Sequence, residues 1–186
     1  MKEALLEPLL RRMRVSKVLP VAERHPECRM LDIGCGWDAR LLRIMEPHIR
    51  LGVGIDFKAP ELQTEKIRTR QYCLNSDLPF EDESFDVVAM LAVLEHLDRP
   101  LEIANEIWRV LAPGGHLVVT VPSRAAKPVL EFLAYKLGIV SEIEIRDHKA
   151  YYNYRDLLAL FSQTRLTMER HRYFQLGMNN FCLLRK

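Results

Sequence analysis

Two spacings of apolar residues alternate along the first two thirds of the chain. Apolar residues at helical spacing predict helices over 38–47, 59–67 and 100–115. Short, nearly unbroken apolar runs between them predict strands over 28–34, 49–56, 85–91 and 116–122, and a more polar run predicts a further strand over 69–75. Strands with almost no polar position are buried on both faces, so the pattern predicts a parallel sheet with helices on each side.

The amino-terminal end and the stretch after the fifth predicted strand follow different patterns. Residues 3–24 have apolar positions at helical spacing, with Pro8 in a first turn or at a break between two helices. Residues 127–138 also have a helical pattern. Over 141–153 the chain is charged and less regular, which predicts a loop.

The carboxyl-terminal part predicts a helix followed by a hairpin. Asn153 is a suitable N-cap, with Asp156 in the first turn, for a helix over 154–163. Two later runs, 166–174 and 179–186, flank a short turn that contains glycine. This arrangement predicts two antiparallel strands added to the parallel sheet.

Composition and charge limit the classes of function. A length of 186 residues suits one domain, and a net charge of +2 is too small to indicate nucleic acid or an anionic membrane as a partner. The longest apolar run, 87–94, is far shorter than a membrane span, and the amphipathic start lacks the apolar segment of a signal peptide. None of the cysteines forms a close pair for zinc or redox chemistry, which favours a reducing, cytoplasmic setting; they are Cys28, Cys35, Cys73 and Cys182.

A pair of glycines, Gly34 and Gly36, follows the first predicted strand, where an open parallel sheet binds its ligand. Lacking side chains, they let the backbone approach a ligand closely. Asp32, at the end of that strand, would repel a pyrophosphate and suit a ligand with an ammonium group; a loop-bracing role is the alternative. Asp56 ends the second strand, where it can accept hydrogen bonds from both ribose hydroxyls of an adenosine cofactor, or act only as a turn residue.

Five segments, in this order and spacing, resemble the class I S-adenosylmethionine-dependent methyltransferases, in particular the group that acts on quinones, natural products and other small molecules. They are LDIGCG, GVGID, NSDLPFEDESFDVV, LEHLDRP and RVLAPGGHLVVTVPS. The resemblance implies an α/β fold with a Rossmann-like, doubly wound, seven-stranded sheet, mostly parallel and ending in a C-terminal antiparallel hairpin. We expect one domain over 1–186, with an N-terminal helical segment (1–26), a cofactor-binding half (28–123) and an acceptor side with the hairpin (124–186).

The resemblance implies S-adenosylmethionine as the cofactor and gives roles to single positions. Asp32, Gly34 and Gly36 match the turn that holds the methionine part of that cofactor. Asp56 matches the ribose-binding acid, and Phe57 follows it in the cofactor site.

Three further positions are assigned to the cofactor by the same resemblance. Asp77 matches the residue that binds the adenine amino group, with the backbone of Leu78 at the ring. Ala92 and the next three residues would line the pocket beside the sulfonium. The family usually has a third glycine at or beside the position of Asp38; aspartate tolerates a left-handed backbone better than most residues, so the turn can be kept.

Methyl transfer from a sulfonium is an in-line displacement that needs no metal, so we expect none, and it needs a base only where the acceptor carries a proton. His96 is the first candidate for that base and His148 is the second; hydrogen bonding to a loop and ordinary packing are the alternatives. Tyr151, Tyr152 and Tyr154 would form a wall of the acceptor pocket, which His96 and the segment 148–154 are expected to face. The charged stretch 141–149 is expected to be a mobile lid.

The expected activity is methyl transfer to an oxygen or nitrogen atom of a small molecule, glycan or lipid, with no nucleic-acid partner. Two alternatives stay open. One is a non-catalytic methyltransferase-like module that binds a partner or only the cofactor. The other is an NAD(P)-dependent oxidoreductase, because residues 34–39 satisfy G-x-G-x-x-A, although such enzymes need an apolar residue where Asp32 stands.

Overall fold

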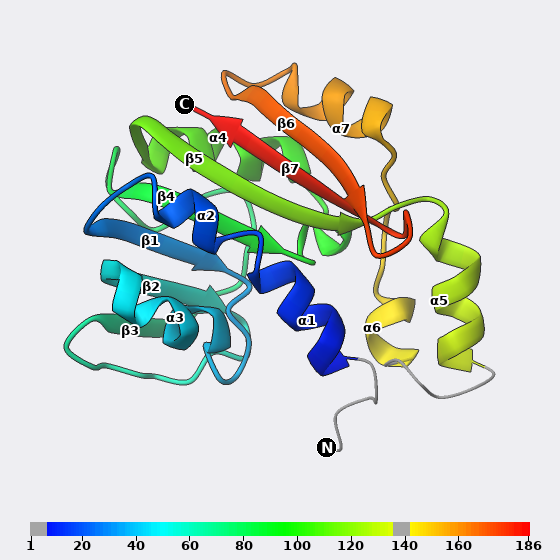
Figure 1. The fold of residues 1–186 in the computed structure, drawn as a ribbon, viewed down its shortest axis with the longest axis horizontal. Helices are drawn as coiled ribbons and strands as arrows, with labels where there is room; N and C mark the ends of the chain where they lie inside the picture. Colours follow the sequence, from blue (N-terminus) through cyan, green and yellow to red (C-terminus); the bar gives the residue numbers. More distant parts are fainter. Residues whose placement is uncertain (1–6, 136–141) are drawn as a thin grey trace.

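A computed structural model describes residues 7–135 and 142–186 of the chain. Its strands form one seven-stranded sheet in the order β3-β2-β1-β4-β5-β7-β6 (Figure 1). All pairings from β3 to β5 are parallel, whereas β7 pairs antiparallel with both β5 and β6. The expected mostly parallel sheet with a terminal hairpin is confirmed. The strands are β1 (Cys28–Ile33), β2 (Ile49–Asp56), β3 (Ile67–Gln71), β4 (Phe85–Leu91), β5 (Leu111–Pro122), β6 (Thr167–Phe174) and β7 (Asn179–Arg185).

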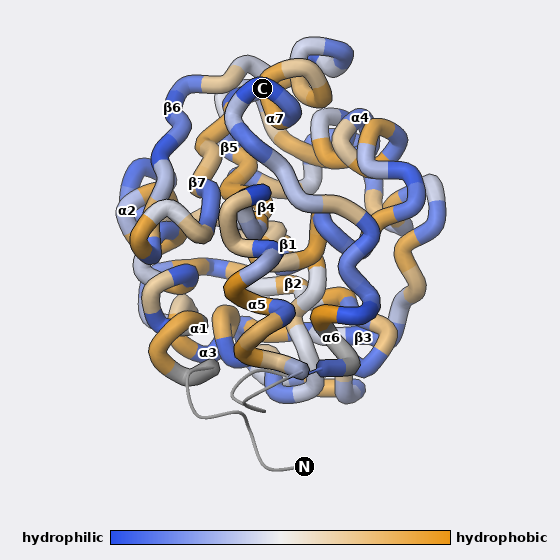
Figure 2. Tube along the Cα trace, turned by 90° about the vertical axis from the view of Figure 1, so that its right-hand side faces the viewer, coloured by the Kyte–Doolittle hydropathy of each residue, from blue (hydrophilic) through white to orange (hydrophobic). Residues whose placement is uncertain are grey.

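Helices cover both faces of this sheet, as a doubly wound fold requires. Buried residues of α1, α2 and α3 pack on one face, and those of α4 and α7 pack on the other. The helices α5 and α6 stand beyond the ends toward which the parallel strands point (Figure 1), and Figure 2 views the molecule from that side. The helices are α1 (Glu7–Val15), α2 (Leu19–Ala22), α3 (Arg40–Met45), α4 (Pro100–Val110), α5 (Ala126–Tyr135), α6 (Glu142–Arg146) and α7 (Tyr154–Phe161), with 3-10 turns η1 (Glu46–His48) and η2 (Leu94–His96).

The central strand β4 shows why its sequence has no polar alternation. Val87 and Ala89 belong to the core under α1–α3, whereas Val88 and Met90 belong to the core under α4 and α7. All four side chains are fully buried. Burial on both faces therefore explains the apolar run that predicted the parallel sheet.

The helix predicted over 59–67 is wrong. This segment turns back along β3: the Thr69 amide donates to the Leu62 carbonyl at 2.8 Å, and the Leu62 amide donates to the Thr69 hydroxyl at 3.1 Å. The segment is short, so a helix there would be marginal by itself, and these bonds to β3 replace it. The strand expected at 69–75 is also displaced, since β3 is Ile67–Gln71.

The helical pattern over 3–24 forms two helices, with Pro8 in the first turn of α1 and the break at 16–18. Residues 3–6 and the end of the helix predicted over 127–138 lie outside the described residues. Throughout the described parts of the chain, the helices are too short or too polar to cross a membrane.

Two predictions about the stretch after α5 have different outcomes. The irregular structure expected over 141–153 is wrong for α6, a regular turn of helix closed by an ion pair between Arg146 and Glu142 at 2.7 Å; residue 141 lies outside the described residues. The predicted N-cap of α7 is confirmed. Asn153 accepts from the Asp156 amide at 3.0 Å, and Asp156 accepts from the Asn153 amide at 2.8 Å, which forms a capping box.

Candidate active site

Two turns meet at the switch point of the sheet, where β1 and β4 lie side by side. The glycine turn follows β1, and the segment leading into η2 follows β4. A Cβ atom on Gly34 would lie 2.2 Å from Cγ2 of Val93, at a left-handed φ of 81°. Only glycine fits there without displacing Val93, so the packing of these turns explains Gly34.

The turn keeps a left-handed residue, but at a different position from the one expected. Ala39, at the amino-terminal end of α3, has φ 48° and is fully buried, whereas Asp38 has no positive φ. Asp38 therefore does not replace the conformational role of a third glycine. The turn reaches α3 through Ala39, whose small side chain limits the strain of a left-handed backbone.

Asp56, at the end of β2, braces the glycine turn. Its Oδ2 accepts a hydrogen bond from the Gly36 amide at 3.1 Å, and its Oδ1 accepts from the Lys58 amide at 2.7 Å. Each carboxylate oxygen has two lone pairs, so both oxygens retain the capacity to accept from a ligand. Phe57, next to it, is 56% exposed.

Asp32 is only 3% exposed at the end of β1. Burial raises the pKa of this carboxyl to about 8, and the nearby charge of Asp56 adds to the effect. Among the described residues Asp32 makes no ion pair. A buried carboxyl of this kind favours its ionised form only when a cationic group approaches, as an ammonium group would.

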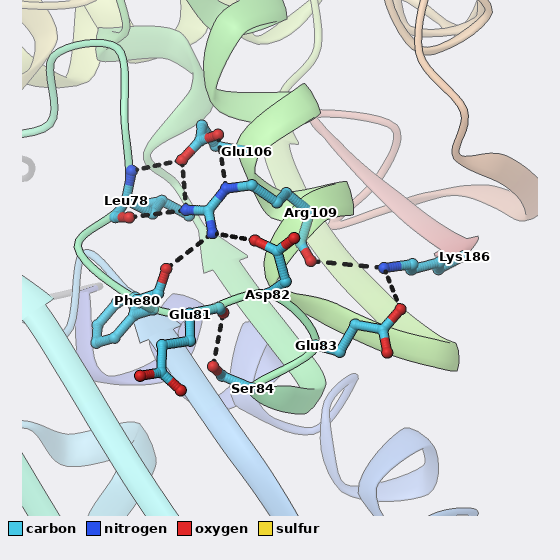
Figure 3. Close-up of polar contacts among 9 residues, drawn as sticks. All are labelled: Leu78, Phe80, Glu81, Asp82, Glu83, Ser84, Glu106, Arg109 and Lys186. Atoms are coloured by element: carbon cyan, nitrogen blue, oxygen red, sulfur yellow. Dashed lines mark hydrogen bonds and ion pairs between the residues drawn. The ribbon is translucent and has the colours of Figure 1, made fainter.

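The loop that contains Asp77 and Leu78 is pinned to α4 by an arginine that the sequence reasoning did not identify. Figure 3 shows the Arg109 guanidinium donating to the carbonyls of Leu78 and Phe80 at 2.9 and 2.8 Å and to the Glu106 carboxylate at 2.7 Å. Glu106 in turn accepts from the Leu78 amide at 2.9 Å. Both backbone polar groups of Leu78 are thus engaged within the protein, and the side chain of Asp77 is exposed. The assignment of these two residues to the adenine stays a prediction.

The two histidines proposed as bases come together although they are far apart in the sequence. The ring centroids of His96 and His148 are 4.9 Å apart in an edge-to-face arrangement. His96 Nδ1 lies 2.8 Å from Oδ2 of Asp147, and His148 Nδ1 lies 3.0 Å from the Tyr151 hydroxyl. These contacts leave Nε2 of each ring for another partner. Burial, with a smaller effect of His96, lowers the pKa of His148 to about 4, so His148 is neutral at pH 7.

Glu95, which the resemblance assigned to the pocket beside the sulfonium, also joins this histidine pair, a role that the sequence analysis did not give it. Its side chain is 1% exposed, and Oε1 lies 4.0 Å from Nε2 of His148. Burial raises the pKa of Glu95 to about 7, which His96 and the Arg14 guanidinium partly oppose. The Glu95 carbonyl accepts from the amide of Lys149 at 2.8 Å, which fastens the segment carrying His148 onto η2.

Tyr151 and Tyr152 have different surroundings. Tyr151 and His148 line a cavity of about 470 Å³ between α5 and α6, together with cationic side chains that include Lys127 and Arg146. Tyr152 does not belong to the described lining of this cavity. It packs against the core under α4 and α7, and its amide donates to Pro122. The structure therefore brings His96, His148 and Tyr151 to one place and leaves Tyr152 packed against the core.

Comparisons with known proteins agree with the fold. A family described as a methyltransferase domain matches residues 31–119. A solved S-adenosylmethionine-dependent methyltransferase from Mesorhizobium loti superposes with a TM-score of 0.69 over 92% of this chain and 95% of its own, at 16% identity. At that identity the match concerns the fold.

Two sequence relatives represent different acceptor classes. The Homo sapiens protein named "Probable tRNA methyltransferase 9B" is 34% identical over 53% of this chain and 22% of its own length. The 27-O-demethylrifamycin SV methyltransferase of Amycolatopsis mediterranei is 31% identical over 66% of this chain and 51% of its own length. This chain therefore spans about a fifth of the length of the first relative and about half of the length of the second. The match of residues 31–119 to a methyltransferase domain, these relatives and the seven-stranded fold together make this chain similar to the class I S-adenosylmethionine-dependent methyltransferases.

Proposed function

We propose that the protein transfers a methyl group from S-adenosylmethionine to an oxygen or nitrogen atom of a small-molecule, glycan or lipid acceptor. One observation carries the proposal: the glycine turn packs directly on Val93, at the start of the segment that ends in His96. This contact puts the carboxylates expected to bind the cofactor and the histidine pair at the same switch point of the sheet.

The residues that flank the glycine turn are suited to hold S-adenosylmethionine. The buried Asp32 carboxyl lacks an ion pair among the described residues and suits the ammonium of the methionine part. Asp56 suits the ribose hydroxyls, because each of its oxygens has a lone pair beyond those used by Gly36 and Lys58. Phe57 offers an exposed aromatic face beside that acid.

The acceptor side is formed by His96, His148 and Tyr151, which lie together beyond the end of β4. When bound, the cofactor supplies a methyl group already activated by the positive sulfur, so the protein has to align the acceptor and remove a proton where one is present. With Nδ1 protonated and donating to Asp147, His96 presents Nε2 as the proton acceptor, and the Asp147 carboxylate stabilises the resulting cation. His148, neutral and held by Tyr151, would position the acceptor at the mouth of the cavity.

Calorimetry with S-adenosylmethionine, its demethylated product and NAD tests the cofactor part of the proposal. We expect heat from the two sulfur nucleosides and none from NAD, which has no ammonium group to pair with the buried Asp32 carboxyl. Heat from NAD alone would favour the oxidoreductase. Binding of the sulfur nucleosides without turnover on any acceptor would favour the non-catalytic module.

Methyl incorporation from labelled cofactor into cell extracts tests the acceptor. The expected label is in the fraction of small molecules, glycans and lipids. The similarity to a protein named as a tRNA methyltransferase supports a second acceptor class, nucleic acid. Parallel extracts with and without ribonuclease separate the two, because label that disappears with ribonuclease treatment identifies RNA and contradicts the proposed acceptor class.

A further inference from the structure

Three side chains of types that can bind a metal ion converge beyond the end of β4. Glu95 and His96 come from η2, and His148 comes from the segment between α6 and α7. Each offers one ligand atom, and these atoms all lie within 4.8 Å of one another. From this geometry we propose that Glu95, His96 and His148 bind a divalent transition-metal ion such as Zn²⁺.

An unsatisfied buried oxygen gives independent support. Oε2 of Glu95 has no hydrogen-bond partner among the described residues, and the side chain is 1% exposed. A buried carboxylate oxygen without a partner costs free energy that a ligand can recover. A metal ion between Glu95 and the histidine rings would provide that partner.

The surroundings of the two imidazoles match those of metal ligands. A ligating histidine usually donates its second ring N–H to a carboxylate or another acceptor, which fixes its orientation. His96 has Asp147 at 2.8 Å from Nδ1, and His148 has the Tyr151 hydroxyl at 3.0 Å from Nδ1. The Nε2 atoms are therefore available for an ion, and both rings are held in place by other groups.

The distances are those of a site that closes slightly around its ion. Ligand atoms in a tetrahedral zinc site, with bonds of about 2.1 Å, lie about 3.4 Å apart. Oε1 of Glu95 and Nε2 of His148 are 4.0 Å apart, so this pair must approach by about half an ångström. All pairs of ligand atoms lie within 4.8 Å, so none has to approach by more than about 1.4 Å. The backbone bond from Lys149 to the Glu95 carbonyl already fixes the two segments relative to each other.

The ligand set selects the class of ion and its role. Two imidazoles and one carboxylate suit Zn²⁺, Fe²⁺, Co²⁺ or Mn²⁺, whereas Mg²⁺ prefers oxygen ligands and water. Three protein ligands leave a position open toward the cavity that His148 lines. The role of the ion rests on the proposed function: an acceptor hydroxyl bound there loses its proton to water at a lower pH than a free hydroxyl, and His96 acts as a ligand instead of a base.

Cobalt binding tests the site without knowledge of the acceptor. The full chain is treated with a chelator, freed of it, and titrated with Co²⁺ while the visible absorption of the ion is recorded. We expect one Co²⁺ per chain, displacement by Zn²⁺ and none by Mg²⁺. Glu95→Gln and His148→Asn should each weaken Co²⁺ binding at least about tenfold. His48→Asn is the matched control, since His48 lies in η1, outside the cluster.

Binding of S-adenosylmethionine to each variant serves as the test of folding and of the proposed function. A variant that loses cofactor binding is replaced by His96→Asn, because His96 is the more exposed of the two histidines, at 26% against 7% of the side chain. Absence of visible Co²⁺ bands in the wild type, or wild-type Co²⁺ affinity in the triad variants, overturns the metal site. If the metal site is overturned but the wild-type protein still binds S-adenosylmethionine, the proposed function stands. If the wild-type protein does not bind S-adenosylmethionine, the proposed function itself is contradicted.

Discussion

The substitution Asp32→Asn should make the protein more stable while it removes cofactor binding. Burial holds the pKa of Asp32 near 8 in the folded protein, against 3.8 for an ordinary aspartate. Because the folded-state value is the higher one, the folded protein binds more protons and loses stability as the pH rises from about 4 to about 8. An asparagine has no proton to lose, so it avoids this loss.

The magnitude follows from the width of that pH window. Each pH unit within it lowers the free energy of unfolding by up to about 1.4 kcal/mol, so the penalty from Asp32 approaches about 4 kcal/mol at pH 7. Relaxation around the carboxylate reduces this upper bound, and we expect Asp32→Asn to raise the free energy of unfolding by about 1–4 kcal/mol at pH 8. For a domain of this length, each kcal/mol corresponds to a Tm increase of about 2–4 °C.

Thermal unfolding of both proteins between pH 5 and pH 8 measures the effect, and calorimetry measures cofactor affinity. The Tm difference should grow with pH, and the dissociation constant for S-adenosylmethionine should rise at least about tenfold, as for the loss of a charge-assisted contact. Glu65→Gln, at an exposed carboxylate, should change neither quantity. A lower Tm for Asp32→Asn at pH 8, or unchanged cofactor affinity, would refute this account of Asp32.

Three other substitutions test the remaining parts of the site. Asp56→Ala should weaken S-adenosylmethionine binding at least about tenfold in calorimetry, and His96→Ala less than about twofold, since only Asp56 is assigned to the ribose; equal losses would contradict the assignment. Arg109→Met should lower the free energy of unfolding by about 2–4 kcal/mol in urea titrations, because the loop over 78–82 loses its anchor. Gly34→Ala should cost about 1–3 kcal/mol in the same assay, from the 2.2 Å contact and the left-handed φ; no change would show that the turn adapts freely. The matched controls for the last two, expected to have smaller effects, are Arg99→Met and Gly36→Ala.

The sequence by itself determined the sheet and several of its local signals. Unbroken apolar runs such as β4 can only be buried on both faces, so they predicted the parallel strands and the covering helices. Asn153 and Asp156 act within one turn of helix, which is why their capping box was predictable. The hairpin was predictable for the same reason, because its turn is short and its two strands are neighbours in the sequence.

Features that depend on contacts beyond a single helix or strand were decided by the tertiary structure. The segment 59–67 has a helical pattern, but Thr69 binds Leu62 and holds it in an extended turn. In the sequence, Arg109 is only one residue of a predicted helix. In the structure its guanidinium holds a loop about thirty positions earlier in the chain, which no local pattern reveals. The Leu62–Thr69 bonds are local in the sequence but form only beside β3, whereas the Arg109 bonds join segments about thirty positions apart.

The candidate site divides in the same way. From the sequence, His96 and the segment 148–154 were expected to face one acceptor pocket, because both follow strand ends at the same edge of the sheet. The structure alone placed the rings 4.9 Å apart and added the buried Glu95 and the exposed Asp147 as their partners. Residue type and spacing determine which side chains can carry chemistry. The packing of the segment that carries His148 against η2 decides which of these side chains meet. That contact comes from backbone hydrogen bonds and packing, which the periodicity of either segment does not encode.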